Sequence, residues 1–522
     1  MKQPFDGSDP AGAVLVIGGG VGGQRAALDL AEAGLRVYLA EMTPILGGRV
    51  AQLGFMFPTH DCVLCRGTSD HGYGCTRPTI SPAFLDHNAH PNIAVRTSTE
   101  VTSVRGQAGD FTVTLVHQPR YVDSGRCTNC GLCEAVCPVA VPNEFQSGLT
   151  LRKVIYKMAP RVAPNSYVVD RAHCQPDCTR CAAVCPTSAI HLNKKQSTET
   201  IHVGAIILAA GYKLFDPHEA EEFGYGRFRN VLTSMQYERL ASRSGPTEGI
   251  VTRVSDNKLP KKIAWLQCVG SRNQEHPYCS TICCMYATKQ AMLTKQRLGA
   301  DAEARIFMMD ERAFSKEFNA YFDQAKEMGV DYTRCRISGI REDAETKDLF
   351  VRFVPETGGK PVEERFDMVV LSVGTEPPKE AQGLARAMGI ELNPFGFCLT
   401  DKFTPLETSQ PGVFVCGTFS SPKEIAETIM DAAGAAGAVM QLMHDHLSHA
   451  SSSRQYPFLA GPSSFPPERD VSNEPVRTGV FLCRCEPTID GVVDTKAVAD
   501  SAWNFPNVMH VERLDYACFP EA

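Results

Sequence analysis

Apolar residues occur along the chain in short runs that predict alternating strands and helices. Runs of about four to six aliphatic and β-branched residues are typical of strands buried on both faces of a parallel sheet. They fall into two groups, at 13–17, 37–40, 206–208 and 413–415, and at 263–266, 304–309 and 366–373. Helices are predicted to follow several of these strands, at 285–297, 316–328 and 423–446. The pattern therefore predicts two α/β units.

The first strand leads into a glycine-rich turn that is typical of dinucleotide-binding units. Gly18, Gly20 and Gly23 satisfy G-x-G-x-x-G before a helical stretch. This spacing lets the chain turn tightly, lets a pyrophosphate approach the backbone and lets helix and strand pack closely. Glu41 follows the next strand, 23 positions after Gly18, where a carboxylate can accept a hydrogen bond from a ribose hydroxyl. We therefore expect this unit to bind a dinucleotide.

Later segments favour FAD as that dinucleotide. A second glycine pair, Gly47–Gly48, follows the acidic residue, and the runs IILAAG and GVFVCG end at Gly211 and Gly417. Both runs are similar to the strands that return to the flavin in two-dinucleotide-domain flavoproteins. Lys423 begins a helix of small residues, whose positive N-terminal end would face the flavin or its phosphates. The expected cofactor-binding residues are Gly18, Gly20, Gly22, Gly23, Glu41, Gly47, Gly48, Gly211, Gly417 and Lys423.

Two cysteine runs give the least ambiguous chemical signal in the chain. The first follows C-x2-C-x2-C-x3-C-P, and the second repeats it with one extra residue in the first gap. These spacings are typical of ferredoxins with two four-iron clusters, in which the fourth cysteine of each run binds the other cluster. The expected ligands are Cys127, Cys130, Cys133, Cys137, Cys174, Cys178, Cys181 and Cys185. Because this unit interrupts the first α/β unit, we expect both of its ends to be held against the flavin domain.

The second α/β unit carries cysteines where a nucleotide-binding unit would carry glycines. Its first strand leads into QCVGSRN, which lacks G-x-G-x-x-G. Four thiols lie between this strand and the next helix, at Cys268, Cys279, Cys283 and Cys284. In a reducing compartment such thiols are typical metal ligands. We therefore expect an iron–sulfur cluster where a nicotinamide nucleotide would dock, and no direct hydride exchange at that place.

Composition narrows the function classes further. The chain has 522 residues, 43% of them hydrophobic, which is enough for about two to four domains. The net charge of -7 is spread without long runs of one sign, so we expect neither nucleic acid nor anionic lipid as a partner. No signal-peptide pattern and no apolar run of about 18 residues is evident. We therefore expect a cytoplasmic protein, or one held at a membrane by another subunit.

The sequence allows two interpretations of the cysteine-rich segment that follows residue 61. Cys62, Cys65 and Cys75 lie beside His60 and His71. A C-x2-C pair with a third thiol is consistent with a metal or redox site, but a fourth ligand is not evident. The same pattern is equally consistent with buried or reactive thiols near the flavin.

The C-terminal part is predicted to be separate from the two α/β units. Residues 451–476 are rich in Ser and Pro, which is typical of a linker. Residues 477–522 are too few for an independent domain, so we expect them to begin a module that is incomplete here. Its thiols, Cys483, Cys485 and Cys518, are candidates for a further cluster without an evident fourth ligand.

These motifs resemble the A subunit of heterodisulfide reductases, over about residues 13–443. The shared stretches are FPTHDCVLC, HPNI, CTNCGLCEAVCPV and GLTLRKVIY, and the most specific is QCVGSRN followed by YCSTICCMYATK. The stretches GVFLCRC, GVVD and YAC are similar to the opening of a module that usually begins that protein. The resemblance implies an α/β, thioredoxin-reductase-like flavoprotein with two dinucleotide-binding domains and an inserted two-cluster ferredoxin.

The resemblance also implies roles and partners. The four cysteines of the second unit would ligate a nonstandard cluster beside the flavin, and Lys289 and Glu238 would lie near the isoalloxazine as the catalytic pair. The cofactors would be FAD and three [4Fe-4S] clusters. The family couples ferredoxin reduction to disulfide reduction by flavin-based electron bifurcation inside a complex. Expected partners are HdrB- and HdrC-like subunits, a hydrogenase- or dehydrogenase-type donor, and ferredoxin.

The expected domains follow from these assignments. They are an FAD-binding domain at 1–120, 198–235 and 375–450, the ferredoxin insert at 121–197, and the cysteine-bearing unit at 236–374. Two other functions stay open. One is a non-bifurcating electron relay in an aromatic-reducing or quinone-linked complex, and the other is an iron–sulfur scaffold without turnover. The glycine fingerprint and both flavin return strands argue against the scaffold.

Overall fold

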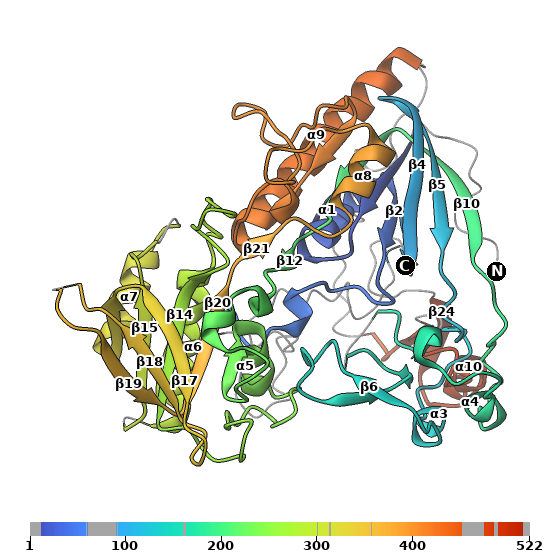
Figure 1. Cartoon of the computed structure of the whole chain (residues 1–522). Helices are drawn as coiled ribbons and strands as arrows, with labels where there is room; N and C mark the ends of the chain where they lie inside the picture. Colours follow the sequence, from blue (N-terminus) through green and yellow to red (C-terminus); the bar gives the residue numbers. More distant parts are fainter. Residues whose placement is uncertain are drawn as a thin grey trace.

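The computed structural model describes residues 12–58, 60, 90, 92–159, 163–299, 301–312, 315–356, 358–450, 474–484 and 489–514. Two α/β units lie side by side, and a smaller unit that carries the cysteine runs is inserted into the first (Figure 1). Among the helices described, none combines the length and the apolar character needed to cross a bilayer.

A five-stranded parallel sheet forms the centre of the first unit. Its strands, in spatial order, are β22 (Val413–Val415), β11 (Ala205–Leu208), β1 (Ala13–Ile17), β2 (Arg36–Glu41) and β3 (Ile93–Thr97). One face is covered by α1 (Val21–Glu32) and α9 (Ile425–Ala450) (Figure 1). The other face is covered by α8 (Ala381–Met388) and an antiparallel sheet of β10 (Ser197–Val203), β5 (Asp110–His117) and β4 (Thr99–Gln107).

The residues of β1 show why the sheet lies between two layers. Val14 and Val16 belong to the core against α1 and α9, whereas Leu15 and Ile17 belong to the core against the antiparallel sheet. Side chains alternate between the faces of a strand, so a strand covered on both faces reads as an unbroken apolar run. Small side chains let α1 and α9 approach each other: Ala26, Ala27, Ala31, Ala432, Ala435 and Ala436.

The insert leaves and re-enters the first unit between two neighbouring strands. β5 precedes it and β10 follows it, and the two strands pair antiparallel from Phe111 with Val203 to His117 with Ser197. A bridge between Val122 and Ile190 closes the base of the insert. It contains α3 (Leu132–Ala135), α4 (Arg180–Ala183), the hairpin of β6 (Ala140–Pro142) and β7 (Leu151–Lys153), and the pair β8 (Ile155–Tyr156) and β9 (Val168–Val169).

A second five-stranded parallel sheet forms the centre of the second unit. Its strands, in spatial order, are β13 (Val231–Thr233), β20 (Met368–Val373), β14 (Lys262–Val269), β15 (Glu303–Met308) and β16 (Val330–Arg334). One face carries α5 (Ser234–Ala241), α6 (Cys283–Leu298) and α7 (Phe318–Glu327). The other carries the antiparallel strands β17 (Ile337–Glu342), β18 (Leu349–Phe353) and β19 (Val362–Phe366).

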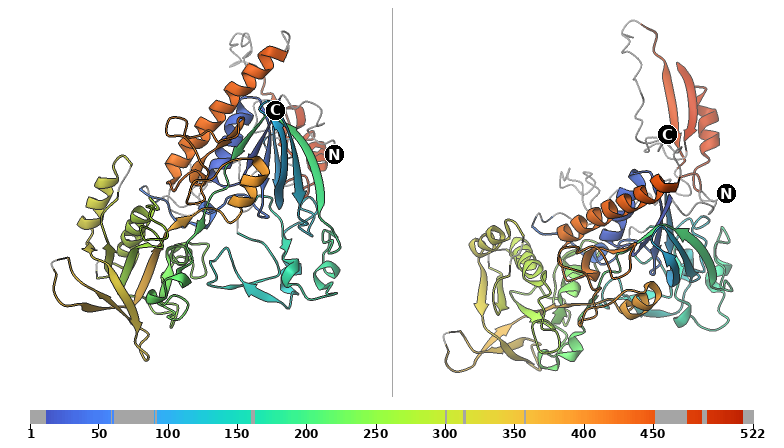
Figure 2. Two further views of the ribbon diagram at one scale, coloured as in Figure 1. Left: turned by 45° about the horizontal axis from the view of Figure 1, so that its top comes forward. Right: turned by 90° about the horizontal axis from the view of Figure 1, so that it is seen from above.

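Short elements connect these units and end the chain. β12 (Lys213–Leu214) and β21 (Thr375–Glu376) pair antiparallel where the chain crosses between the two α/β units. The last elements are β23 (Thr478–Cys483), α10 (Thr495–Ala502) and β24 (Val508–Leu514), and the two strands pair in parallel. Figure 2 shows this small unit beyond the C-terminal end of α9.

The structure differs from the sequence-based expectations in three places. Residues 94–104 are strand-like in the sequence and predict one strand. They form two strands in different sheets, because Ser98 lies in the left-handed region with a φ of 53° and redirects the chain between β3 and β4. The antiparallel strands β17 to β19 were not predicted. The predicted domain boundary at residue 236 places β13 in the first unit. In the structure β13 pairs with β20 in the second sheet. A strand of three residues is too short to show a periodic pattern in the sequence.

A polar cluster joins β3 and β10 of the first unit and makes its stability depend on pH. Glu199 accepts hydrogen bonds from Arg96 at 3.0 and 3.1 Å and lies 2.8 Å from the ring of His117. These contacts, that with His117 first, lower the pKa of Glu199 to about 2. The stabilisation is therefore complete above the ordinary glutamate pKa of about 4.3 and is lost as the pH falls toward the lowered value.

We expect Glu199→Gln to destabilise the protein by about 1 kcal/mol at neutral pH, a small effect because the cluster is partly exposed to water. The fall in Tm below about pH 5 should also become shallower. Thermal unfolding of the variant at several pH values measures both effects. Glu100→Gln on neighbouring β4, an exposed position, is the control. An acid profile identical to that of the unmodified protein would contradict the assignment.

Candidate functional site

The turn after β1 has the backbone geometry of a dinucleotide-binding loop. Gly18 has a φ of 109°, and a Cβ added there would lie 2.1 Å from the carbonyl oxygen of Ala209. A Cβ at Gly23 would lie 1.8 Å from the carbonyl oxygen of Gly18. At Gly20 an added Cβ meets no atom within 4 Å. The first and third glycines are thus required by packing, and the second leaves the backbone open to a ligand.

The end of β2 and the second glycine pair close around this turn. Glu41 accepts a hydrogen bond from the backbone N–H of Gly19 at 2.6 Å. Gly47 donates its N–H to the carbonyl of Gly19 at 2.9 Å, and Gly48 packs on Gly20. Residues that were predicted from three separate segments therefore meet at one place.

The return strands complete the same site. Thr428 of α9 lies against two of the predicted glycines, because a Cβ at Gly22 or at Gly417 would be 3.0 or 2.9 Å from its methyl group. Gly211 lies in the left-handed region with a φ of 72°, and an added Cβ there meets no atom within 4 Å. The open backbone at Gly20 and Gly211 and the packed glycines around it fit a bound FAD.

Lys423 is paired with a carboxylate near the start of α9. Its ammonium forms an ion pair with Asp431 and donates a hydrogen bond to Ser420 at 2.9 Å. Asp431 also accepts the backbone N–H of Gly417 at 3.2 Å. The sequence did not predict this role for Asp431. Its only signal in the sequence is that it is a carboxylate in a helix of small residues. The contact of Lys423 with the cofactor stays a prediction.

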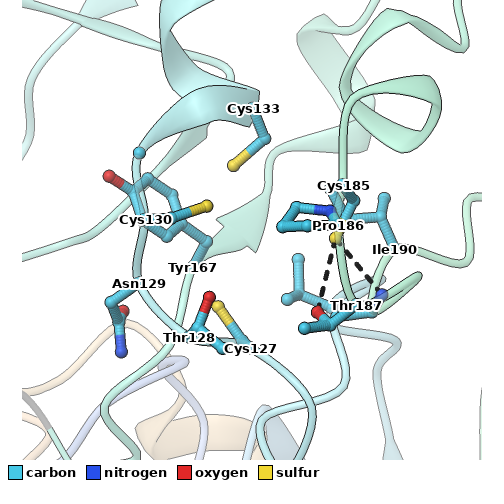
Figure 3. Close-up of a pocket in the computed structure, with 13 residues that line it drawn as sticks. Cys127, Thr128, Asn129, Cys130, Cys133, Tyr167, Cys185, Pro186, Thr187 and Ile190 are labelled. Carbon is cyan, nitrogen blue, oxygen red and sulfur yellow. Dashed lines mark hydrogen bonds between the residues drawn. The ribbon is translucent and has the colours of Figure 1, made fainter. Parts of the chain in front are cut away.

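Thiols from both cysteine runs meet in the insert. Cys127, Cys130 and Cys133 of the first run and Cys185 of the second line one cavity of about 330 Å³, including its open mouth (Figure 3). This is the combination that the ferredoxin spacing predicts. Among the residues described, no three metal-binding side chains meet at one point, as they would at a single-ion site. Four thiols arranged around a cavity fit a four-iron cluster.

The thiols of this site differ in their surroundings. Burial raises the pKa of Cys133 to about 11, and the neighbouring Cys127 and Cys130 add to the effect. Burial also opposes ionisation of Cys185, but the N–H of Ala189 at 3.3 Å and the hydroxyl of Thr187 at 3.7 Å outweigh it and lower its pKa (Figure 3). Hydrogen bonds to a ligand sulfur are a known means of tuning a cluster.

The remaining cysteines of the two runs form a second group. Burial raises the pKa of Cys181, and the charges of the nearby Cys174 and Cys178 raise it further. Cys137 and Cys181 both belong to the buried core of the insert. The donor set of three thiols from one run and one from the other therefore fits a second cluster.

The end of β14 turns sharply before α6. Cys268 lies in the left-handed region with a φ of 62°, and the pairing of β14 with β20 is irregular between Leu266 and Val269. This conformation is unfavourable for a residue with a side chain and persists only where its surroundings fix it. An irregularity of this kind redirects a side chain at the end of a strand. Cys283 and Cys284 are the first two residues of α6.

The four thiols of this turn lie together. Cys283 lies near both Cys268 and Cys284, and these two neighbours raise its pKa well above the usual value. The hydrogen bond with Cys283, assisted by the charge of Arg272, lowers the pKa of Cys268 to about 7 against the effect of burial. Burial raises the pKa of Cys279, and the charges of Cys284 and Cys268 raise it further. The arrangement fits a cluster bound by all four cysteines.

Positive and donor groups surround these thiols. Arg272 pairs with Asp310 just after β15, with Nη2 and Oδ2 at 3.0 Å, and Arg312 lies 3.3 Å from the same carboxylate. The hydrogen bond with Cys283 and the backbone N–H of Arg312 lower the pKa of Cys284. The N-terminal end of α6 adds a partial positive charge. These groups favour the thiolate form of Cys268 and Cys284, and the thiolate is the form that binds metal.

Lys289 and Glu238 form an ion pair in the interior. The Lys289 ammonium lies 2.5 Å from Oε1 of Glu238, and their side chains are only 1% and 4% exposed. Lys289 also donates to the carbonyl of Phe55 at 2.7 Å. Glu238 accepts hydrogen bonds from Gln290 at 2.7 Å and from the N–H of Gly54 at 3.1 Å. Their contact with the flavin stays a prediction.

Several cysteines of the sequence analysis lie outside the described residues. They are Cys62, Cys65, Cys75, Cys485 and Cys518. Cys483, the last residue of β23, is half-buried. A site at either group therefore stays a prediction.

The fold and the site define a class of protein. The protein has two parallel sheets, a glycine fingerprint in the first sheet, and an inserted unit with two cysteine runs. These features define a two-dinucleotide-domain flavoprotein with a ferredoxin insert. Residues 177–438 match the model of the pyridine nucleotide-disulphide oxidoreductases, residues 126–190 that of a 4Fe-4S dicluster domain, and residues 13–68 that of FAD dependent oxidoreductases. The chain belongs to the pyridine nucleotide-disulphide oxidoreductase family. The expected fold class, FAD and [4Fe-4S] clusters are confirmed; the number of clusters stays a prediction.

Curated relatives confirm the resemblance inferred from the sequence. The second iron-sulfur A subunit of the CoB–CoM heterodisulfide reductase of Methanopyrus kandleri is 43% identical over 427 residues, which cover 81% of this chain and 63% of the relative. The A subunit of the H(2)/formate:CoB-CoM heterodisulfide,ferredoxin reductase of Methanococcus maripaludis is 42% identical over 430 residues, with the same coverage of 81% and 63%. The chain thus spans 63% of the length of these relatives.

Solved structures are similar at a lower level. The thioredoxin reductase of T. acidophilum has a TM-score of 0.44 and 16% identity, and the match covers 83% of this chain and 98% of that one. The thioredoxin reductase of Lactococcus lactis has a TM-score of 0.42 and 14% identity, with coverage of 83% and 99%.

We expect Cys185→Ala to remove one cluster of the insert, because Cys185 is the only thiol that the second run contributes to the cavity in Figure 3. Iron per chain should fall from about 12 to about 8, the difference of one four-iron cluster. Iron analysis and EPR of anaerobically purified protein measure the change.

The matched control for this variant is Cys335→Ala, which removes a half-buried thiol outside both cysteine runs. Its iron content should equal that of the unmodified protein. An unchanged iron content and EPR spectrum in Cys185→Ala would contradict the assignment of Cys185 as a ligand.

Proposed function

We propose that the chain is the FAD and iron–sulfur electron-transfer subunit of a heterodisulfide-reductase-like complex, and that it is the flavin-based electron-bifurcating core of that complex. It would link ferredoxin to a disulfide or similar acceptor on partner subunits. The convergence of Cys268, Cys279, Cys283 and Cys284 at the β14–α6 turn is the observation that supports this proposal most. The names of the relatives, which are heterodisulfide reductase A subunits, support it further.

The polar groups of the β14–α6 turn already have hydrogen-bond partners within the protein. Ser271 donates a hydrogen bond to the carbonyl of Tyr278 at 2.9 Å, and its hydroxyl oxygen accepts the N–H of Ser280 at 3.1 Å. The hydroxyl of Ser280 accepts the N–H of Thr375 at 2.9 Å. In a nucleotide-binding unit the corresponding N–H groups would receive a pyrophosphate. The closed turn and its thiols favour a bound cluster over a bound nucleotide.

When bound, FAD takes up or gives electrons in pairs or singly, and each [4Fe-4S] cluster carries one electron. The chain's own residues would set the paths. The ferredoxin insert leaves and re-enters the first unit at the paired strands β5 and β10, which would keep its thiols near the flavin-binding turn. The four cysteines of the second unit would hold a third cluster. Two separate routes therefore lead away from one flavin site.

Lys289 and Glu238 would control the charge beside the flavin. In this structure Glu238 neutralises Lys289 in the interior. We infer that Lys289 can instead face negative charge on the reduced cofactor, which its ammonium would stabilise. Pairing with Glu238 would remove this stabilisation of the reduced cofactor. Two arrangements of one lysine would thus give the cofactor two potentials, as the splitting of an electron pair requires.

Electron-transfer partners are part of the proposal. They would be HdrB- and HdrC-like subunits, a hydrogenase- or dehydrogenase-type donor, and ferredoxin. The name of the relative from Methanococcus maripaludis mentions CoB-CoM heterodisulfide and ferredoxin, which fits an acceptor of each kind.

We expect Lys289→Ala to lower the midpoint potential of the bound flavin and to reduce turnover at least about tenfold, because the buried cation is lost. Redox titration of the FAD-loaded protein and stopped-flow reduction by ferredoxin measure these effects.

Lys295→Ala on the same helix is the matched control, since the Lys295 ammonium donates to the carbonyl of Ala302 at 2.8 Å and not to Glu238. It should leave both quantities unchanged. Unchanged flavin potentials and turnover in Lys289→Ala would refute the proposed control by this pair and favour a non-bifurcating relay.

A further inference from the structure

The tip of the β6–β7 hairpin is where the ferredoxin insert meets the second α/β unit. Gln236 of α5 donates a hydrogen bond to the carbonyl of Ser147 in this tip at 3.1 Å. Gln146 donates to the carbonyl of Ser244, just after α5, at 3.0 Å. The hairpin tip, residues 144–147, is therefore fixed to α5 and to the residues that follow it.

Arg239 lies at the centre of this contact, with a side chain that is 0% exposed. Its guanidinium donates hydrogen bonds to Oε1 of Gln146 at 2.9 Å and to the carbonyl of Gln52 at 2.7 Å. It also donates to the hydroxyl of Ser244 at 2.8 Å and lies 4.7 Å from the ring centroid of Phe145. One buried side chain thus joins the insert, the first unit and the second unit.

Residues 52–55, which we call the strap, connect Arg239 to the ion pair. The N–H of Gly54 is bound by Glu238, and the carbonyl of Phe55 is bound by Lys289. The side chain of Gln52 donates to two carbonyls of the hairpin tip, at 3.2 and 3.1 Å. The strap is therefore held by the hairpin tip at one end and by the ion pair at the other.

Arg239 is a buried cation with neutral hydrogen-bond partners. Within the part of the chain that the structure describes, no carboxylate forms an ion pair with it, and its acceptors are an amide, a carbonyl and a hydroxyl. Burial lowers the pKa of Arg239 to about 10, against the opposing charge of Glu238, so the group is positively charged near neutral pH. An unpaired buried charge is costly unless it balances another. Glu238 is the adjacent residue on α5.

We propose that Arg239 is a positioning residue that balances the charge of Glu238 when Lys289 is not paired with it, and that docks the hairpin tip on the strap. This inference rests on the proposed function of the ion pair. Without Lys289, Glu238 keeps the hydrogen bonds from Gln290 and Gly54 and the nearby charge of Arg239. The carboxylate is then not isolated in the interior, so the release of Lys289 costs less. The insert holds the guanidinium in place.

Two substitutions separate the charge of Arg239 from its hydrogen bonds. In Arg239→Gln the charge is lost, Lys289 stays on Glu238, and the flavin midpoint potential shifts in the same direction as in Lys289→Ala. In Arg239→Lys the charge remains but the forked hydrogen bonds are lost. The potential then stays near its original value, while electron transfer between the insert and the flavin slows by roughly tenfold. Both are measured on anaerobically purified protein with FAD and clusters in place.

A double variant tests whether Arg239 acts through Lys289. Lys289→Ala with Arg239→Gln should have the potential of Lys289→Ala alone, because the effects of residues that act on one another do not add. Arg253→Gln removes another buried arginine of the second unit, which pairs with Asp348 at 2.7 Å. This control should lower Tm without shifting the potential.

Three results would overturn the role of Arg239. They are an unchanged potential in Arg239→Gln, additive shifts in the double variant, and unchanged electron-transfer rates in Arg239→Lys. If Arg239→Gln does not retain FAD, the electron-transfer rate of Arg239→Lys decides whether the proposed role of Arg239 holds. An unchanged potential in Lys289→Ala would instead refute the proposed function on which the inference rests, so the two failures are distinguishable.

Discussion

The placement of four neighbouring thiols on the β14–α6 turn is the constraint on which the rest of the account depends. Thiolates repel one another, so only a fixed backbone, and then a bound metal, can hold them together. The left-handed conformation of Cys268 and the adjacent Cys283–Cys284 at the start of α6 supply that backbone. Arg272 and the end of the helix offset the accumulated negative charge.

The proposed replacement of a nicotinamide by a cluster at the β14–α6 turn would determine how the units have to be arranged. A nicotinamide would collect electrons at the second unit as hydride, whereas a cluster passes them one at a time. A flavin site that exchanged electrons with clusters would need these clusters at fixed positions. The insert is anchored on two paired strands, and its hairpin tip is locked to α5 through Arg239. The strap links the same buried contact to Glu238 and Lys289, so the geometry of the insert and this ion pair are physically connected.

Local patterns in the sequence predicted the fold class and the cofactors. The glycine fingerprint and the cysteine spacings are readable because each is contained in one turn or one short run, where the backbone alone determines the geometry. The bounds of β1 and the position of α6 follow from apolar runs of ordinary length. The resemblance to heterodisulfide reductase A subunits rested on the same short stretches and is confirmed by the relatives.

Other features depend on contacts between distant segments and could not be predicted. Asp431 meets Gly417 and Lys423 only because α9 returns to the glycine turn. Arg239 has no distinguishing pattern in α5, and its partners come from residues 52, 146 and 244. The division of the run 94–104 depends on the single positive φ of Ser98. Side chains that join units leave no periodic signal in the sequence.

The most direct test is a diffraction experiment at the iron absorption edge on crystals grown without oxygen and soaked with NADH. The account predicts an anomalous peak enclosed by Cys268, Cys279, Cys283 and Cys284, with no nucleotide density at the turn between β14 and α6. Absence of iron from these four sulfurs, or NADH bound across the turn, would contradict it.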